Sequence, residues 1–310
     1  MSTIDRQRGV AIITALLIVA IATTVSVTIS TRLQLDVRRT GNMIGGDQAY
    51  LYTLAAESWS RRILRIDREE SQIDHLGENW AIELPPLPVE GGYIQGKMTD
   101  LQSCLNLNNL LATNTDNSVS RVRLERMLDN LGIDKGNTQA IIDWIDNDLQ
   151  TTIPDGAEDV YYMNLERPYR SANAPLQSVS ELRLIRGFED PKVYNTVLPH
   201  VCAFGVSAPI NINTASEEVL RSLADNISDN DVEQIIERRT ETAFNNINEF
   251  TGFNDLKKKI ASTEGLSVDT EYFMLVTKST IGQVTTIVYS IIHRSNDGKI
   301  TVIARSQGVY

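Results

Sequence analysis

Residues 143–159, DWIDNDLQTTIPDGAED, have the composition of a cation site. They include no lysine or arginine and six acidic residues: Asp143, Asp146, Asp148, Asp155, Glu158 and Asp159. An oxygen-rich, histidine-poor segment that forms turns suits Ca²⁺, which takes six to eight oxygen ligands. We therefore expect this segment to bind calcium. The candidate ligands are Asp146, Asp148, Asp155, Glu158 and Asp159. The weaker candidates are Asp143, Ser171 and Asn173.

The chain must leave a helix within this segment if its carboxylates are to converge. The isoleucine-rich start at 141–145 indicates a buried helix face, whereas Asp146 and Asp148, two residues apart, do not share a face. Turn residues come next, at 154–156. The segment is not an EF-hand, because the twelfth position counted from Asp146 is Ala157 rather than glutamate. A solvated acidic loop without metal is the alternative.

The N-terminal region carries an uncharged, hydrophobic run between Arg8 and Arg32. It is long enough to cross a bilayer as a helix, which takes about 20 apolar residues. A conventional export signal is the alternative, because Ala20-Ile-Ala22 fits a small-residue cleavage site. The residues after the run distinguish a retained anchor from a discarded signal.

Helical character continues beyond this run. Residues 47–65, DQAYLYTLAAESWSRRILR, are rich in alanine and leucine and contain no proline. Four side chains lie close to one helical stripe: Tyr50, Leu54, Ser58 and Ile63. Only Gly41 and the pair Gly45-Gly46 interrupt the pattern, at a cost of about 1 kcal/mol each, so a bend or local melting is expected there. The pattern predicts one long N-terminal helix, hydrophobic first and amphipathic later.

The composition favours an exported, anchored protein. The chain has 310 residues and 42% hydrophobic composition, enough for one or two cores. Its net charge of −11 makes nucleic acid a poor partner. Two cysteines exclude a four-thiolate zinc site, and no GxSxG, HExxH or P-loop motif occurs. We therefore predict a protein without enzymatic activity; a secreted hydrolase and a DNA receptor are the alternative classes.

Short β segments flank a long helical stretch. Strands are expected at 79–84 and 91–99, with a proline-rich turn between them. Three further β-branched runs at 272–306, joined by short turns, predict an antiparallel meander. From about 101 to 269 the pattern is helical. The sequence therefore predicts an α+β fold in which a long N-terminal helix packs on an antiparallel sheet and a large helical domain is inserted into that sheet.

The helical stretch contains an internal repeat. LNLNN at 105–109 is echoed by ININT at 210–214, and residues 126–142 match 221–237 at a constant offset. A third element, SVSELRLIRGF or NNINEFTGF, comes after each copy. Each unit is expected to be a pair of short helices with a connecting turn, followed by a helix start. The second copy resembles helix-hairpin-helix modules, some of which bind DNA, but its turn, NISDND, is acidic and lacks glycine.

The short basic leader that ends in glycine, followed by a hydrophobic helix, resembles the type IV prepilin class. In that class a membrane peptidase cleaves after the glycine, here Gly9, and the new N-terminus, here Val10, is methylated. The hydrophobic segment therefore survives cleavage. Most members carry glutamate at the fifth mature position, which is Thr14 in this chain.

The leader, the split sheet, the duplicated helical stretch, the acidic segment and YRSANAPLQSVSEL together resemble the K-type minor pseudopilins of type II secretion systems. The resemblance covers almost the whole chain. It implies a single-pass inner-membrane protein, most of it periplasmic, with bound calcium. It also implies that the protein forms the tip of the pseudopilus with the I-type and J-type minor pseudopilins and supports export of folded proteins. Prepilin peptidase and secreted substrates are the further partners expected.

This interpretation divides the chain into five parts. Residues 1–9 are the leader, 10–31 the transmembrane part of the helix, and 32–100 the pilin-like helix with the first strands. Residues 101–269 are the inserted helical domain, and 270–310 are the C-terminal strands.

Two further expectations concern single positions. Cys104 and Cys202 are expected to form a disulfide, because the helical domain would fold in an oxidising periplasm; two buried free thiols are the alternative. Thr14 is expected to mark the subunit at the end of the filament, because in this class the glutamate pairs with the N-terminal ammonium of a neighbour. A tip subunit has no such neighbour. The alternative is a merely tolerated threonine, since Thr23 and Thr24 lie in the same run.

Overall fold

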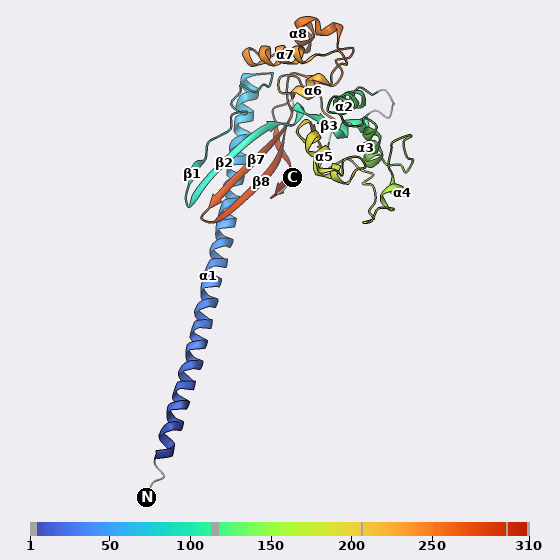
Figure 1. Ribbon diagram of the computed structural model, residues 1–310. Helices are drawn as coiled ribbons and strands as arrows, with labels where there is room; N and C mark the ends of the chain where they lie inside the picture. The colour runs from blue at the N-terminus through green and yellow to red at the C-terminus, as the bar shows by residue number, and fades with distance from the viewer. Residues whose placement is uncertain (1–4, 113–117, 206, 296, 309–310) are drawn as a thin grey trace.

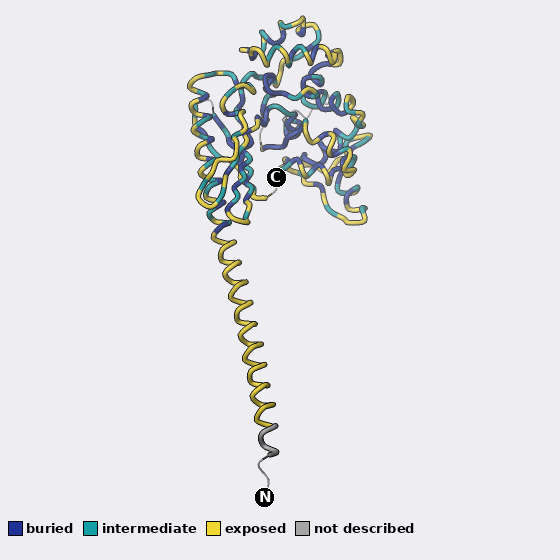
Figure 2. Tube along the Cα trace, turned by 60° about the vertical axis from the view of Figure 1, so that its left-hand side comes forward, coloured by how far each residue is buried: buried dark blue, intermediate teal, exposed yellow. Residues whose placement is uncertain are grey.

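A single long helix carries the rest of the molecule. The computed structural model describes residues 5–112, 118–205, 207–295 and 297–308. Helix α1 (Asp5–Glu70) is continuous over 66 residues, roughly 100 Å at 1.5 Å per residue. Its N-terminal half projects away from the body with its hydrophobic side chains exposed (Figures 1 and 2). The glycines at 41–46 lie within this continuous helix, so the helix does not melt there.

The body of the protein contains an antiparallel sheet in the order β1-β2-β7-β8-β9. Its strands are β1 (Leu87–Val89), β2 (Gly92–Asp100), β7 (Tyr272–Ile281), β8 (Val284–Arg294) and β9 (Ile300–Gln307). The predicted strand at 79–84 is wrong, because that segment forms turns and the proline-rich segment supplies β1 instead. Proline has no backbone N–H to donate. Pro88 is nevertheless tolerated in β1, because an edge strand has no hydrogen-bonded neighbour on one side. The predicted α+β fold is confirmed.

The C-terminal half of α1 packs on this sheet through a stripe that recurs every three to four residues. Its buried members are Ala49, Thr53, Glu57, Ser60, Leu64 and Asp67. The predicted stripe was displaced by one position, and its Tyr50 and Ser58 are exposed. Acids can occupy the buried face because Glu57 pairs with Arg305 of β9 (Nε to Oε2, 2.6 Å). Such pairing offsets part of the cost of burying a charge.

The inserted domain leaves the sheet at the end of β2 and returns at the start of β7. These points are adjacent, because Asp100 lies opposite Phe273 in the sheet register. The insertion consists of two units, and each opens and closes with a pair of short parallel strands. The first unit, residues 105–202, contains β3 (Leu105–Asn106), α2 (Val119–Asn130), α3 (Asn137–Ile145), α4 (Asp159–Tyr162), α5 (Pro191–Val197) and β4 (Val201–Cys202).

The second unit, residues 210–267, repeats this plan in shorter form. It contains β5 (Ile210–Asn211), α6 (Glu217–Arg221), α7 (Asp229–Glu241), α8 (Ile247–Gly252) and β6 (Leu266–Ser267). Short 3₁₀ helices lie at Leu101–Ser103, Leu107–Ala112, Val179–Leu184, Leu198–His200 and Phe253–Lys258. One hydrophobic core runs through both units, and a separate one lies between the sheet and α1.

A buried asparagine in each unit accounts for the repeated motif. Asn108 donates through Nδ2 to the Leu176 carbonyl (2.9 Å) and accepts through Oδ1 from the Leu176 N–H (2.8 Å). Asn213 makes the same two bonds with Phe244, at 3.0 and 2.9 Å. Each side chain thereby fixes the chain at the start of the third repeated element. We call this pair the asparagine latches.

Buried polar side chains also join the insertion to the body. Asp100 accepts hydrogen bonds from the Thr270 hydroxyl (2.6 Å) and the Gln102 N–H (2.6 Å). Arg294 at the end of β8 pairs with Asp67 of α1 (2.7 Å) and with Asp74. Burial raises the pKa of Asp100 to about 6, although these hydrogen bonds oppose the rise. Asn211 of β5 also donates through Nδ2 to Asp100 Oδ2 at 3.1 Å, so the contacts tie α1, the sheet and the second unit together.

Candidate metal site and assembly surfaces

The acidic segment begins where α3 ends. Ile145 is the last residue of α3, and Asp146 comes next as its C-cap with extended backbone (φ −75°, ψ 171°). The chain then runs without regular structure to Glu158, the N-cap of the four-residue helix α4. The chain thus leaves the helix at the first candidate ligand, which allows acids two residues apart to face one point.

Three carboxylates of this segment converge. One oxygen from each of Asp146, Asp148 and Glu158 lies within 4.8 Å of the others. Asp146 Oδ1 and Glu158 Oε1 are buried and have no hydrogen-bond partner in the described part of the chain, and the same holds for Asn173 Oδ1. Buried acceptors without partners are costly. A hard cation that prefers oxygen ligands would supply the missing contacts, so this donor set fits Ca²⁺.

Two of the weaker candidate ligands, Ser171 and Asp143, make hydrogen bonds beside the three converging carboxylates. The Ser171 hydroxyl lies 3.1 Å from Glu158 Oε2 and 3.0 Å from Asp159 Oδ1. Asp143 is fully buried and accepts from the Thr152 N–H, 3.1 Å from its Oδ2. These contacts orient the loop and engage some of its oxygens.

The remaining candidates differ in where their oxygens point. The carboxylate of Asp155 faces Gly136, where an added Cβ would approach Oδ2 to 2.6 Å. Asp155 and Asp159 both lie outside the group of three converging carboxylates. Asn173, a weaker candidate, has its N–H bonded to the Trp144 carbonyl at 2.9 Å, beside the end of α3. The structure therefore favours a narrower ligand set than the sequence did.

Burial and crowding change the protonation of this cluster. Burial, followed by the charges of Asp148 and Asp143, raises the pKa of Asp146 to about 6. Burial raises the pKa of Glu158 to about 7, against the opposing hydrogen bond from Ser171. Near neutral pH, Glu158 in the metal-free cluster is therefore partly protonated, and a divalent cation would displace that proton.

A disulfide closes the first unit. Cys104 and Cys202 are bonded, with their Cα atoms 5.8 Å apart. Cys202 lies in β4 opposite Asn106 of β3, so the bond lies beside the strand pair that begins and ends the unit. The second unit has no cysteine. The disulfide is thus one structural difference between the two units.

The N-terminal helix carries the processing and filament positions. Within the described residues, α1 is the one helix long and apolar enough to cross a membrane. Gly9 and Val10 lie within this helix, and residues 1–4 lie outside the described part of the chain. The Thr14 hydroxyl lies 3.1 and 3.0 Å from the carbonyl oxygens of Val10 and Ala11. Thr14 carries no charge, and the hydrogen-bonding capacity of its hydroxyl is met within its own helix.

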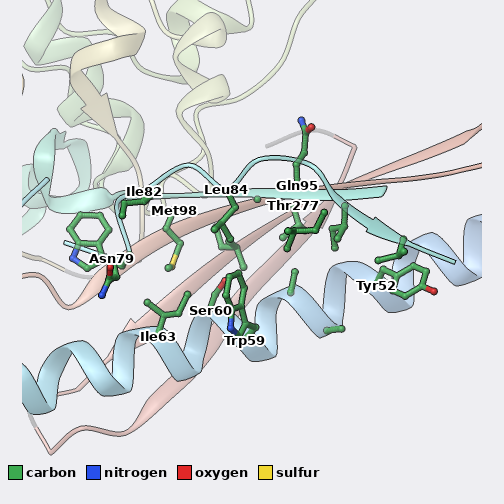
Figure 3. Close-up of a pocket in the computed structure, with 18 residues that line it drawn as sticks. Tyr52, Trp59, Ser60, Ile63, Asn79, Ile82, Leu84, Gln95, Met98 and Thr277 are labelled. Atoms are coloured by element: carbon green, nitrogen blue, oxygen red, sulfur yellow. The ribbon is translucent and has the colours of Figure 1, made fainter. Parts of the chain in front are cut away.

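An apolar groove runs between α1 and the β1–β2 side of the sheet. Figure 3 shows Trp59 and Ile63 of α1 facing Ile82, Leu84 and Met98 across it. The groove has a volume of about 200 Å³. Trp59 remains 43% exposed. This flank of α1 thus leaves part of its hydrophobic surface uncovered.

The fold places this protein in the class of pilin-like proteins. Its defining features are a membrane-length N-terminal helix, an antiparallel sheet packed on that helix, and a domain inserted into the sheet. Two family models, both described as type II secretion system protein K, match residues 103–206 and 210–269. These limits fall at the ends of the two units. The chain belongs to the type II secretion system protein K family, as the sequence predicted.

Individual relatives agree with this assignment. The type II secretion system protein K of Pseudomonas aeruginosa is 34% identical, over 97% of this chain and 93% of that protein. The protein K of Aeromonas hydrophila is 30% identical, over 99% of both. The structure resembles a chain of the GspK-GspI-GspJ complex from enterotoxigenic Escherichia coli, with a TM-score of 0.79 and 25% identity, over 88% of this chain and 100% of that chain.

Proposed function

We propose that this protein is a minor pseudopilin that forms the tip of the pseudopilus with I-type and J-type partners. It acts without enzymatic activity and supports the export of folded proteins. The observation that carries the proposal is the position of the inserted domain, which lies at the opposite end of the molecule from the start of α1 (Figure 1). A further subunit stacking above would meet this domain. The similar chain from E. coli comes from a complex with GspI and GspJ.

Thr14 supports the same position. A carboxylate within an apolar helix bundle requires a cationic partner, and an aspartate at the centre of a membrane helix costs roughly 2.5 to 3.5 kcal/mol on insertion scales. The last subunit of a filament has no neighbour above it to supply that partner. A neutral threonine, bonded to its own helix, avoids this cost.

The test localises an epitope tag on this protein along isolated pseudopili by electron microscopy. We expect labelling at one end of each filament. A tag on a major shaft subunit serves as the control and should label the whole length. Labelling of this protein along the shaft would refute the tip assignment.

We also propose that residues 10–31 anchor the protein in the inner membrane with most of the chain in the periplasm. Prepilin peptidase would cleave after Gly9 and leave a methylated Val10. Mass spectrometry of the membrane-bound protein should find that terminus, and Gly9→Val should abolish it. A mature protein that begins after Ala22 would support the export-signal alternative instead.

The third part of the proposal is that the acidic cluster holds calcium. Asp146, Asp148 and Glu158 are the proposed carboxylate ligands, and Asn173 adds an amide oxygen. Bound calcium would neutralise the crowded charges and fix the loop that carries them, so it should stabilise the fold by mass action. Calorimetry of the full chain in detergent, with and without EDTA, tests this. An unchanged melting temperature with no calcium in the purified protein would contradict it.

A further inference from the structure

A buried ion cluster lies where the inserted domain meets the body of the protein. It consists of Asp67 near the end of α1, Asp74 and Glu78 in the segment after that helix, and Arg294 at the end of β8. Each of these side chains is at most 10% exposed. One carboxylate oxygen from each acid lies within 4.8 Å of the others. We call these four residues the junction cluster.

The junction cluster holds more negative than positive charge. Arg294 donates from Nη1 to Asp67 Oδ2 at 2.7 Å and from Nη2 to both oxygens of Asp74. Glu78 pairs with no arginine or lysine in the described part of the chain, and its Oε2 accepts instead from the Trp80 Nε1–H at 2.7 Å. Three carboxylates thus share one guanidinium. Like charges this close in a buried site favour protonation of one of them.

The charged groups around the junction cluster do not supply the missing positive charge. Arg68 lies 3.7 Å from Asp269 and is engaged there. His75 is partly exposed, and its Nε2 lies 3.7 Å from Glu78 Oε1. The other titratable groups that border the cluster are Glu70, Asp100, Glu271 and His293. Most of them are acids, so the deficit of positive charge remains.

The geometry favours a proton over a metal ion as the missing charge. Arg294 already lies against two of the acids, so a metal cation there would face the guanidinium at close range. Asp67 is the acid placed to take the proton, because only its Oδ2 receives a side-chain hydrogen bond among the described residues. It also borders a cavity of about 300 Å³ beside α1. The exposed Glu70 lines the same cavity, which connects Asp67 with solvent.

The protonation of Asp67 agrees with this geometry. Burial, followed by the charge of Glu78, raises the pKa of Asp67 to about 7, against the opposing hydrogen bond from Arg294. An aspartate in an unfolded chain has a pKa of about 3.9. The folded protein therefore binds one more proton at this position than the unfolded chain between about pH 4 and 7, and its stability falls as the pH rises through that window.

The second unit is attached at the junction cluster. Asp74 Oδ2 accepts from the Thr270 N–H at 2.7 Å, and the Asp74 carbonyl accepts from Asn211 Nδ2 of β5 at 3.0 Å. Arg294 donates to the Thr270 carbonyl at 2.9 Å. A change of charge in the cluster therefore acts on the contacts between the inserted domain and the body.

We propose that Asp67 binds a proton and that this proton makes the joint between the inserted domain and the body sensitive to pH. With the proton bound, Asp74 and Arg294 hold the second unit against α1 and β8. When the proton leaves, unbalanced negative charge weakens these contacts. The proton site lies outside the first unit and its acidic segment.

The test is urea denaturation of the full chain in detergent at pH 5 and pH 8, with EDTA present throughout. Asp67→Asn mimics the protonated acid, because the amide is neutral and keeps an oxygen for Arg294. We expect the unfolding equilibrium constant of the parent to rise, relative to that of Asp67→Asn, at least about tenfold from pH 5 to pH 8. At pH 8 the variant should be at least as stable as the parent. Asp47→Asn, an exposed change on the same helix, should keep the parent's pH dependence.

Two further measurements separate proton binding from a structural role. Infrared spectroscopy should show a protonated carboxyl group at pH 6 that is lost at pH 8 and is missing in Asp67→Asn. Glu78→Gln removes a charge that disfavours ionisation of Asp67. It should therefore lower the pH at which this carboxyl band disappears, even if Asp67→Asn does not fold.

Three results would each overturn the proposal. One is a loss of stability in Asp67→Asn at both pH values with the parent's pH dependence intact, as expected of an ordinary ion pair. The second is a carboxyl band that is the same in the parent, Asp67→Asn and Glu78→Gln. The third is loss of the pH dependence in His75→Asn, which would assign the titration to the histidine.

Discussion

The two units of the inserted domain share a scaffold and differ most in the length of one loop. In both, a helix is followed by a chain segment that an asparagine latch holds at its far end. In the second unit, α7 ends at Glu241 and the latch holds Phe244, so only residues 242–243 intervene. In the first unit, α3 ends at Ile145 and the latch holds Leu176, so residues 146–175 intervene. We call these residues the acidic loop.

This difference shows why the first unit needs contacts that the second lacks. The acidic loop has little regular structure beyond the four residues of α4. Aromatic packing holds part of it, because Tyr162 lies 5.2 Å from Trp144 and 5.3 Å from Tyr169 between ring centroids. Among the described residues, no donor reaches Asp146 Oδ1 or Glu158 Oε1 of the converging carboxylates. A cation bound at that point would hold the loop in place of the backbone hydrogen bonds that a helix or strand would provide.

Removal of the disulfide should produce the largest change, and it acts on the first unit. The double variant Cys104→Ala and Cys202→Ala should lose about 4 to 5 kcal/mol of unfolding free energy, because the bond closes a long loop. Urea denaturation of the full chain in detergent measures this. Titration of the unfolded, unreduced parent should find no free thiol; two free thiols per chain would contradict the pairing.

The latches should matter equally in both units. Asn108→Ala and Asn213→Ala should each cost about 2 to 4 kcal/mol, because each leaves a buried N–H and a buried carbonyl without partners. The exposed Asn248→Ala is the matched control and should change stability by less than about 0.5 kcal/mol. A loss below about 1 kcal/mol at only one latch would show that the two units are not equivalent.

Calcium should stabilise the first unit selectively. At a hundredfold excess over its dissociation constant, calcium should add about 2.7 kcal/mol of stability. EDTA should increase hydrogen exchange over residues 146–175 and leave residues 229–252 unchanged. Asp146→Asn should abolish the stabilisation, whereas Asp155→Asn, an equally conservative change outside the converging group, should retain it. If both variants lost the calcium-dependent stabilisation equally, Asp155 would belong to the ligand set, as the sequence predicted.

Calcium binding should weaken as the pH falls. Glu158, with its pKa raised to about 7, must lose its proton to bind metal, so calcium affinity should fall about tenfold between pH 8 and pH 6. Metal-free protein should respond in the opposite direction. Its raised carboxyl pKa values mean that the folded state binds more protons than the unfolded chain between about pH 4.5 and 7, so its stability falls as the pH rises through that window. Calorimetry at both pH values, with calcium or EDTA, distinguishes the two responses.

Local sequence patterns were sufficient to predict the parts of this protein whose structure depends on residues that are close together in the chain. A run without charge predicted the membrane-length helix, β-branched runs predicted β7, β8 and β9, and the echo of LNLNN in ININT predicted two related units. The composition of residues 143–159 predicted an oxygen-rich loop. For the helix and the strands, the deciding interactions are hydrogen bonds or burial patterns within about twenty residues of the chain.

Tertiary structure decided the features that depend on distant partners. The buried face of α1 is displaced from the sequence prediction because Glu57 meets Arg305, 248 positions away. The converging acids are Asp146, Asp148 and Glu158, and not Asp155, because the path of the acidic loop decides which oxygens point inward. Arg123 carries no signal in its local sequence; only the packing of the two units against each other buries it and brings it to the Ser262 carbonyl. Long-range packing sets burial and charge pairing, and both depend on contacts that periodicity does not encode.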